Sequence, residues 1–162
     1  MCINYRKLIK VSRKYHFPLP FLDHILERVT GHPYYYFLNG YSGCYQIPIA
    51  LKDQENTTFT CPFRTFAFKK MSFGLFNALA IFKKCMLSIF NDMVEHCLKV
   101  FMDDLTMHEN SFDDCLDNLG KNLKRCIEKE IVLNWKKCHY VITSGIVLGH
   151  VVSVKGIEID KA

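Results

Sequence analysis

Two neighbouring acids, Asp103 and Asp104, lie between two short apolar runs of the sequence. Apolar runs on both sides of a polar pair predict a β-hairpin that carries the acids at its turn. Aspartate is common in turns because its side chain hydrogen-bonds the nearby backbone, so the pair has an ordinary structural explanation. The apolar flanks favour a second one, since adjacent charges beside buried strands are costly unless a cation or water neutralises them. Hard divalent cations such as Mg²⁺ prefer carboxylate oxygens, so this hairpin is a candidate metal site.

The helices that must support this hairpin are predicted from apolar spacing. One helix is expected between Pro20 and Gly31, where apolar residues recur at helical spacing with start and stop signals at the ends. A long amphipathic helix is expected over residues 77–93, with Lys83 on its polar side. This second helix is expected to lie in the core.

A third helix is predicted after Ser111, which resembles the start of a capping box with Asp114. Its buried stripe is expected to contain Leu116, Leu119, Leu123 and Ile127. Short strands are expected at residues 34–38, 46–49, 57–60, 63–68, 98–102, 105–107, 132–133, 140–142, 146–152 and 157–159. The aromatic residues at 63, 66 and 68 alternate, which favours packing over base stacking. Strands interleaved with two long helices on one side predict an α+β layer arrangement.

Composition excludes several classes of protein. With 162 residues, of which 49% are hydrophobic and 23% charged, the chain is expected to form one globular domain or a large piece of one. No stretch approaches the roughly 20 apolar residues of a membrane helix. Residues 1–7 lack the apolar centre of a signal peptide, so we expect an intracellular protein without membrane contact.

The eight cysteines are scattered without a Cys-x-x-Cys pair and are expected to be free thiols. A zinc site of Cys126, Cys138 and His139 is a weaker alternative, because the paired ligand spacing of zinc modules is missing. The formal charge of +5 fits a polyanionic partner, but the basic clusters are short and each alone is more typical of a solvated surface.

Beyond these physical signals, the chain resembles the reverse transcriptases of gypsy-type LTR retrotransposons. That family carries an aromatic-x-Asp-Asp hairpin, which Phe101-Met102-Asp103-Asp104 matches. Other motifs of the family occur in the same order over nearly the whole chain: Tyr5-Arg6-Lys7-Leu8, Pro18-Leu19-Pro20, Leu38-Asn39, Ser42-Gly43-Cys44, Gln46-Ile47, Ser72 to Leu79, Lys137-Cys138 and Leu148-Gly149-His150. This many motifs in order make coincidence implausible.

The resemblance implies an α+β fold: a reverse-transcriptase palm, which is a ferredoxin-like antiparallel sheet with helices on one face, plus partial fingers. Residues 1–162 would form one fragment of a reverse transcriptase domain, without a complete thumb or RNase H. The implied reaction adds deoxynucleoside triphosphates to a primer on an RNA or DNA template, with two Mg²⁺ ions for which Mn²⁺ can substitute. Further implied partners are the thumb, RNase H and integrase domains of a Pol polyprotein. The implied location is a cytoplasmic virus-like particle or the nucleus, and no targeting signal is seen.

The resemblance also implies roles for single residues. Asp103 and Asp104 would hold the metal ions, and the backbone carbonyl of Gly40 would offer a further ligand. Lys137 is the candidate proton donor to pyrophosphate, and a solvated lysine after Trp135 is nearly as good an explanation.

Two more groups of residues receive roles in the same way. Cys44, Phe73 and Gly74 would contact the incoming nucleotide, and Leu148-Gly149-His150 resembles the primer grip.

Several motif positions depart from the family. Its other metal-bridging aspartate falls at Asn39, which lacks the negative charge, so this copy is expected to be inactive. Cys44 stands where the family has an aromatic ring that rejects ribonucleotides, so weaker sugar discrimination is expected. Ser72 and Leu79 replace prolines, which is expected to loosen the loop that shapes the nucleotide pocket.

Two other interpretations stay open at this point. The chain could be a non-catalytic nucleic-acid-binding module, whose affinity for a duplex would fall steeply with salt. It could also be a gene-model fragment without function, which would give a molten and aggregating product.

Overall fold

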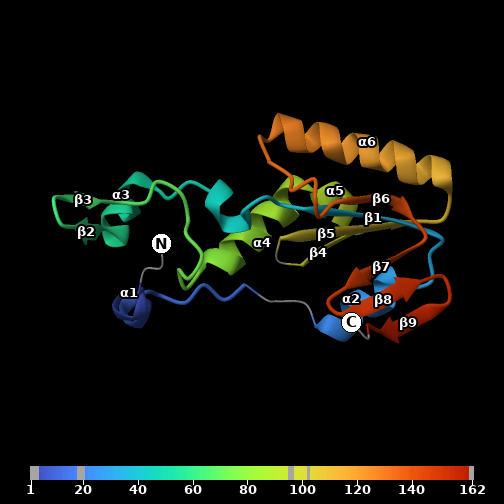
Figure 1. Cartoon of the computed structure of the whole chain (residues 1–162), viewed down its shortest axis with the longest axis horizontal. Coiled ribbons are helices and arrows are strands. Elements are labelled where there is room, and N and C mark those ends of the chain that lie inside the picture. Colours follow the sequence, from blue (N-terminus) through green and yellow to red (C-terminus); the bar gives the residue numbers. More distant parts are fainter. Residues whose placement is uncertain (1–3, 18–20, 95–96, 102, 161–162) are drawn as a thin grey trace.

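Figure 1 shows the computed structural model of the chain, which describes all residues except 1–3, 18–20, 95–96, 102 and 161–162. A four-stranded antiparallel sheet lies at its centre, with the strand order β4-β5-β1-β6. The strands are β1 (Tyr34–Asn39), β4 (Leu98–Phe101), β5 (Asp104–Glu109) and β6 (His139–Ile142). Strand β1 lies between β5 and β6. The register of β1 with β5 pairs the last residue of β1, Asn39, with the first residue of β5, Asp104.

Side chains alternate between the two faces of this sheet, as the pleat requires. Tyr36 and Leu38 of β1 point to the face that holds the main core, together with Leu105 and Met107 of β5. The helices α4 (Ala78–Ile89), α5 (Asn91–Val94) and α6 (Phe112–Glu128) pack on this face. The expected α+β arrangement, with the two long helices on one face of an antiparallel sheet, is therefore confirmed.

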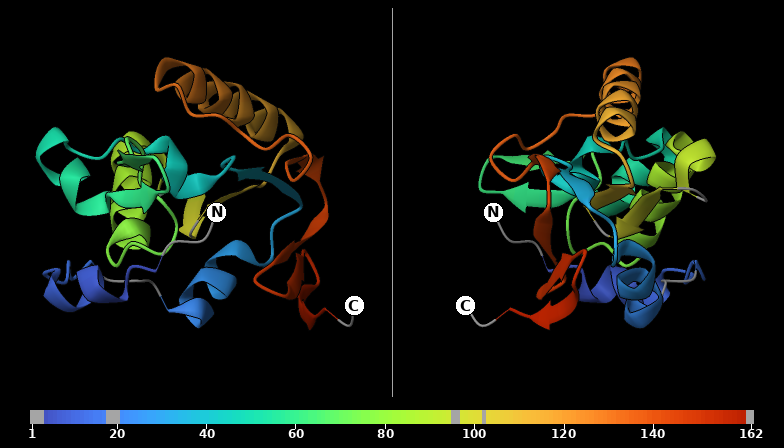
Figure 2. Two further views of the ribbon diagram at one scale, coloured as in Figure 1. Left: turned by 60° about the vertical axis from the view of Figure 1, so that its left-hand side comes forward. Right: turned by 90° about the vertical axis from the view of Figure 1, so that its right-hand side faces the viewer.

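The opposite face is covered only at one end. There α2 (Leu22–Val29) and a three-stranded antiparallel sheet pack around Tyr35 of β1. The small sheet consists of β7 (Ser144–Val147), β8 (His150–Ser153) and β9 (Gly156–Ile159). Figures 1 and 2 show α6 on one side of the central sheet and α2 with β7–β9 on the other. The end of this face that carries Asn39 is left open.

Short elements extend away from the central sheet and form the left side of Figure 1. They are α1 (Arg6–Val11), η1 (Gly43–Gln46), α3 (Leu51–Gln54), η2 (Glu55–Thr57), β2 (Phe59–Cys61) and β3 (Arg64–Phe66). The strands β2 and β3 form an antiparallel hairpin in which Phe59 stacks on Phe66. Phe63, which alternation placed in packed surroundings, is 94% exposed at the turn of this hairpin.

The third predicted helix exists with the expected cap, and its predicted buried stripe is confirmed at Leu119 and Leu123 but wrong at Leu116 and Ile127. Asp114 N–H donates to the Ser111 hydroxyl at 3.1 Å, and that hydroxyl also bonds the Asp114 carboxylate. The buried residues of α6 are Cys115, Leu119, Asn122 and Cys126, whereas Leu116 and Ile127 are exposed. The Asn122 side chain donates to the Tyr36 hydroxyl at 2.6 Å, so a buried hydrogen bond sets the rotation of the helix.

The second predicted helix is divided at Phe90, a fully buried residue between α4 and α5. Lys83 is also buried, contrary to its predicted place on the polar side. Its ammonium lies 5.4 Å from the centre of the Phe17 ring, where a cation–π contact compensates part of the lost hydration. The signal at Pro20 for the first helix falls outside the described residues, and α1 was not predicted.

Three strand predictions also differ from the structure. Residues 43–46 form the 3-10 helix η1, and Pro48 makes only an isolated bridge to Lys70. Residues 132–133 contribute a single bridge, from Leu133 to Gly40. The strand expected at 146–152 is a hairpin that reverses at Leu148 and Gly149, both with positive φ. A non-glycine residue in this conformation is hard to anticipate from apolar spacing.

The described cysteines are free thiols and most are buried, as expected. Cys126 and Cys138 lie in the main core, whereas His139 is exposed on the other side of the sheet, so these three do not form a zinc site. In the described part of the chain, no helix combines the length and apolar character that crossing a membrane requires.

A pair of stacked histidines lies at the end of the sheet away from Asn39. The rings of His32 and His108 are parallel within 16°, with centroids 3.9 Å apart. The Nε2 atom of His108 is buried and has no hydrogen-bond partner in the described part of the chain. Burial, followed by the nearby charges of His32 and Lys99, lowers the pKa of His108 from 6.5 to about 4. The folded chain therefore favours the neutral imidazole.

We expect the free energy of unfolding to fall as the pH decreases from 6.5 to 4. The unfolded chain takes up a proton at His108 near pH 6.5, whereas the folded chain resists protonation down to about pH 4. Urea unfolding at several pH values measures this effect. His108→Phe should remove much of the pH dependence, and His16→Phe at an exposed position should retain it. Identical pH profiles for the two variants would contradict the assignment.

Candidate active site

The register of β1 and β5 brings Asn39 beside Asp104 at the open end of the sheet. Asn39 lies two residues after Phe37 and Asp104 lies two residues before Thr106, so both side chains point to the same face of the sheet as Phe37 and Thr106. At this end of the sheet, α2 and β7–β9 leave that face uncovered. The Nδ2 atom of Asn39 donates a hydrogen bond to Oδ1 of Asp104 at 2.5 Å. The amide therefore neutralises part of the field of this carboxylate without adding a charge.

Asp103 is held by the turn that follows β1. Its backbone carbonyl accepts a hydrogen bond from Gly40 N–H at 2.9 Å. Its carboxylate lies against Gly43, where a Cβ atom would overlap all three carboxylate atoms. Gly43 also has a φ of +41°, which favours glycine at this position. The turn thus forms a notch that fits a carboxylate.

The Asp103 carboxylate is short of partners in this notch. Its Oδ1 atom is buried and makes no hydrogen bond within the described residues. Burial, and then the charge of Asp104, raises the pKa of Asp103, while Lys137 lowers it. A buried carboxylate beside another acid is favourable when a cation lies between them.

A cavity of about 440 Å³ opens in front of Asn39 and Asp104 on the uncovered face, and Asp103 is not among its lining residues. It gathers Asn39, Asp104, Lys137 and Leu148, which come from four separate parts of the chain. Sequence reasoning had singled out each of these residues, and the fold brings them together. Gly149 and His150 follow Leu148 in the β7–β8 turn, where His150 Nδ1 lies 3.1 Å from the Leu148 carbonyl.

Other residues that line the same cavity were missed. They include Lys99, Thr106 and His139. Lys99 alternates with Phe101 of the aromatic-x-Asp-Asp motif along β4 on the face of Asp104, so the period of two in the predicted hairpin could have identified it. His139 could not have been found in this way, because its strand was predicted to begin one residue later.

The residues expected to contact a nucleotide lie in two places. Cys44 is buried beside the notch, and burial followed by the Asp103 charge raises its thiol pKa to about 11. Phe73 is 73% exposed, and Gly74 has a φ of +98° in the loop before α4. Neither Phe73 nor Gly74 lines the cavity of Asn39 and Asp104.

The loop that carries Phe73 is tied down, contrary to the expectation that serine would loosen it. Ser72 is buried, and its hydroxyl lies 2.7 Å from the Tyr5 hydroxyl. Leu79 lies in the first turn of α4, where leucine is a good helix former. A buried hydrogen bond thus replaces the backbone rigidity of a proline.

Gln46 joins the notch to the segment that leads to Lys137. Its Nε2 atom donates to the carbonyls of Tyr41 and Val132, at 2.7 and 2.9 Å, and its Oε1 accepts from Val132 N–H at 2.8 Å. The same segment is fixed by Asn134 N–H, which donates to the Asn39 carbonyl at 2.8 Å. These contacts give the Gln46-Ile47 motif a structural role.

The carbonyl of Gly40, expected to be a metal ligand, already accepts a 3.3 Å hydrogen bond from Gly43 N–H. A carbonyl oxygen has two lone pairs, so a second partner is compatible with this bond.

The residues present fit a divalent cation, but only two of the three acidic positions expected from the family, 103 and 104, carry a carboxylate, since position 39 is an asparagine. Among the described residues, no cluster of three or more His, Cys, Asp or Glu side chains could hold a metal ion. Asp103 and Asp104 supply two carboxylates, and the Oδ1 atom of Asp103 is buried without a hydrogen-bond partner among the described residues. Asn39 contributes only an amide, which is a weaker ligand for a hard cation than a carboxylate.

Comparison with known proteins agrees with this arrangement. Residues 1–152 match the family described as reverse transcriptase (RNA-dependent DNA polymerase). An RNA-directed DNA polymerase homolog of Oenothera berteroana is 35% identical over 122 residues, which cover 74% of this chain and 86% of that protein. The Pol polyprotein of transposon 297 from Drosophila melanogaster is 28% identical over 96% of this chain. The chain spans only 15% of that polyprotein.

Solved structures show the same fold. The foamy viral protease-reverse transcriptase in complex with RNA/DNA hybrid superposes with a TM-score of 0.90 at 19% identity, over 98% of this chain and 21% of that one. The same enzyme in complex with dsDNA gives a TM-score of 0.90 over 99% of this chain and 33% of that one. The antiparallel sheet, the paired Asp103 and Asp104, and the match over residues 1–152 lead to one conclusion: the chain belongs to the reverse transcriptase family.

Proposed function

We propose that the open face of the central sheet binds a primer and its RNA or DNA template. In this proposal the carboxylate notch is the polymerase centre, which Asn39 holds inactive. The observation that carries it is the Asn39 amide, hydrogen-bonded to Asp104 beside the unpartnered Asp103 carboxylate. The similar foamy viral enzyme was solved in complex with dsDNA and with RNA/DNA hybrid, which supports a nucleic-acid duplex as the partner.

Reverse transcriptases generally use divalent metal ions, and we propose Mg²⁺, with Mn²⁺ as a substitute. Asp103 and Asp104 would hold these ions, and the Gly40 carbonyl would offer a further oxygen. Bound there, the ions would polarise the primer hydroxyl and stabilise the pyrophosphate leaving group. The free Oδ1 of Asp103 supports its assignment as the principal ligand.

The loss of one carboxylate is sufficient to suppress catalysis. Asn39 keeps the shape of an aspartate, but its neutral amide cannot offset the charge of two cations. If this weakens the binding of the transition state by about 4 kcal/mol, the rate falls on the order of a thousandfold.

The other cavity residues would bind and position the substrates. Lys137 would give a proton to pyrophosphate, and its charge already acts on Asp103. Cys44 would lie under the sugar of the incoming deoxynucleotide, with Phe73 and Gly74 on the adjoining loop. Leu148, Gly149 and His150 would hold the primer, and Leu148 faces the cavity of Asp104.

Residues 1–162 would form one reverse transcriptase domain that comprises the palm and part of the fingers. The chain spans 15% of the transposon 297 polyprotein. It would work together with the thumb, RNase H and integrase domains of a Pol polyprotein. A cytoplasmic particle or the nucleus is the proposed location, on the strength of the family alone.

A second candidate function is nucleic-acid binding without catalysis. The hydrogen bond from Asn39 to Asp104 favours it, because the amide lets these two strands pair without a metal ion. The cavity also carries Lys99, Lys137 and His139, which suit a phosphate backbone. This function would show as salt-dependent binding of a duplex without extension of the primer.

Restoring the carboxylate should make the stability of the protein depend on metal ions. In Asn39→Asp, the hydrogen bond to Asp104 is lost and three acids meet, so we expect a loss of about 1 kcal/mol or more in EDTA. Mg²⁺ at millimolar concentration should reverse this loss. Thermal unfolding of the unmodified chain, Asn39→Asp and the control Asn56→Asp measures the effect. A similar response to Mg²⁺ in all three proteins would count against the site.

Primer extension on an RNA template with Mg²⁺ and deoxynucleotides tests catalysis. We expect extension by Asn39→Asp, and none by the unmodified chain or by the double variant Asn39→Asp/Asp103→Asn, because only the first restores the full set of acids. If no variant extends the primer but all bind the duplex, the binding function replaces the catalytic one. Extension by the unmodified chain would disprove the inhibitory role of Asn39.

A further inference from the structure

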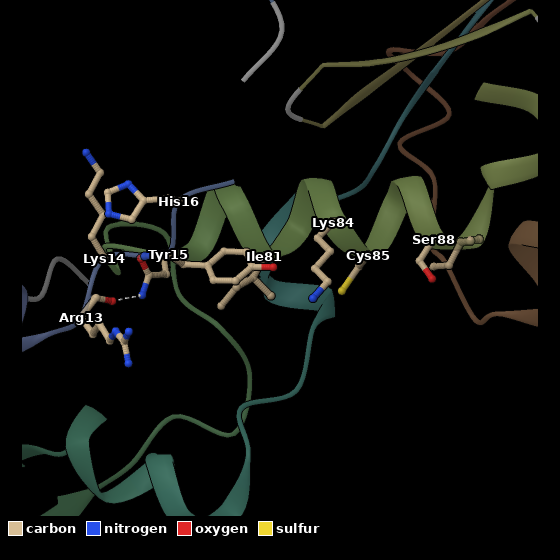
Figure 3. Close-up of a pocket in the computed structure, with 10 residues that line it drawn as sticks. Arg13, Lys14, Tyr15, His16, Ile81, Lys84, Cys85 and Ser88 are labelled. Atoms are coloured by element: carbon tan, nitrogen blue, oxygen red, sulfur yellow. Dashed lines mark hydrogen bonds between the residues drawn. The ribbon is translucent and has the colours of Figure 1, made fainter. Parts of the chain in front are cut away.

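A second and larger cavity, of about 1110 Å³, lies along one flank of α4 (Figure 3). One wall is the extended segment 13–16, and the other is a row of α4 residues that includes Ile81, Cys85 and Ser88. None of its lining residues belongs to the cavity of Asn39 and Asp104. No role proposed above for the polymerase centre uses this surface.

The wall formed by segment 13–16 is fixed to α4 in advance. Tyr15 N–H donates to the Asn77 side chain at 3.0 Å, and that side chain donates back to the Arg13 carbonyl at 2.9 Å. The Lys84 ammonium lies 5.3 Å from the Tyr15 ring, which stacks in parallel on Phe17 at 6.2 Å. A ligand would therefore meet a pre-formed wall and would lose little affinity in ordering it.

The lining of this cavity has one sign of charge. Arg13, Lys14 and Lys84 are cationic, His16 lies beside them, and no acid is among the described lining residues. Tyr15 and His16 both expose their rings, and in Figure 3 the Tyr15 ring lies across α4 beside Ile81 while the His16 ring lies near the start of the helix. Cationic side chains around exposed rings are the combination that binds unpaired nucleotides, through phosphate contacts and base stacking.

We propose that the α4 flank is a second nucleic-acid site, which binds a single strand. Arg13, Lys14 and Lys84 contact the phosphates, and Tyr15 and His16 provide surfaces for the bases. A duplex is a poorer occupant because its base faces are already stacked inside the helix. The site goes beyond the proposed polymerase centre and needs neither its metal ions nor its chemistry.

Fluorescence anisotropy of a labelled 12-mer oligo-dT tests this site. In Arg13→Gln/Lys14→Gln/Lys84→Gln we expect at least tenfold weaker binding at low salt, and a salt slope smaller by about 2, since each lost phosphate contact removes about 0.7. The control Lys121→Gln/Lys124→Gln/Lys129→Gln removes the same charge from exposed positions on α6 and at its C-cap, and it should bind within twofold of the unmodified chain. Equal losses in both triple variants would overturn the proposal, because net charge alone would explain them.

A single variant controls for the possibility that the triple variant disturbs the structure of segment 13–16. Ser88→Glu leaves every contact of segment 13–16 in place and adds a negative charge to the cavity, so it should also weaken the oligonucleotide at least several-fold. Unchanged binding by this variant would overturn the proposal.

Cross-linking locates the bound strand. An oligonucleotide with 5-iodouracil should form adducts on the peptide that contains Tyr15 and His16, and adducts confined to the cavity of Asp104 would refute the second site. A poly-glutamate peptide of equal charge should not displace the strand, and efficient displacement would show an anion site without preference for nucleic acid. These assays require no catalysis, so their outcome is separate from that of primer extension.

Discussion

The antiparallel pairing of β1 with β5 is the constraint on which the rest of the molecule depends. Strand β1 comes from early in the chain and inserts between β5 and β6, so one register places Asn39 against Asp104 and Gly40 N–H against the Asp103 carbonyl. A shift by one residue would turn Tyr36 and Leu38 out of the main core. The burial of these two side chains and the geometry of the notch are therefore set by the same pairing.

The notch also shows how one neutral side chain changes the electrostatics of a site. With an aspartate at position 39, three acids would repel one another unless cations were present. The amide of Asn39 replaces one of these repulsions with a hydrogen bond to Asp104. The repulsion between Asp103 and Asp104 remains, and together with burial it raises the pKa of Asp103. The site is therefore compatible with a folded chain that binds no metal, at the expense of the ligand charge that metal binding requires.

Residues with a local signature were predicted well from the sequence. The hairpin that carries Asp103 and Asp104, the cap at Ser111 and the strand ending at Asn39 follow from short-range patterns, and the motif order supplied Lys137 and Leu148. Features that depend on distant partners were missed. The rotation of α6 is set by the hydrogen bond from Asn122 to Tyr36, 86 residues away, and no apolar period reveals it.

The hydrogen bond of Gly40 also bears on the chemical ageing of the protein. Asparagine followed by glycine is prone to deamidation, because the glycine nitrogen can attack the side-chain amide and close a succinimide ring. Here that nitrogen donates its hydrogen to the Asp103 carbonyl, and Asn39 is held in an extended strand, so ring closure needs local unfolding. The folded chain therefore protects Asn39, and a stored sample would convert to the aspartate form only as fast as this strand opens.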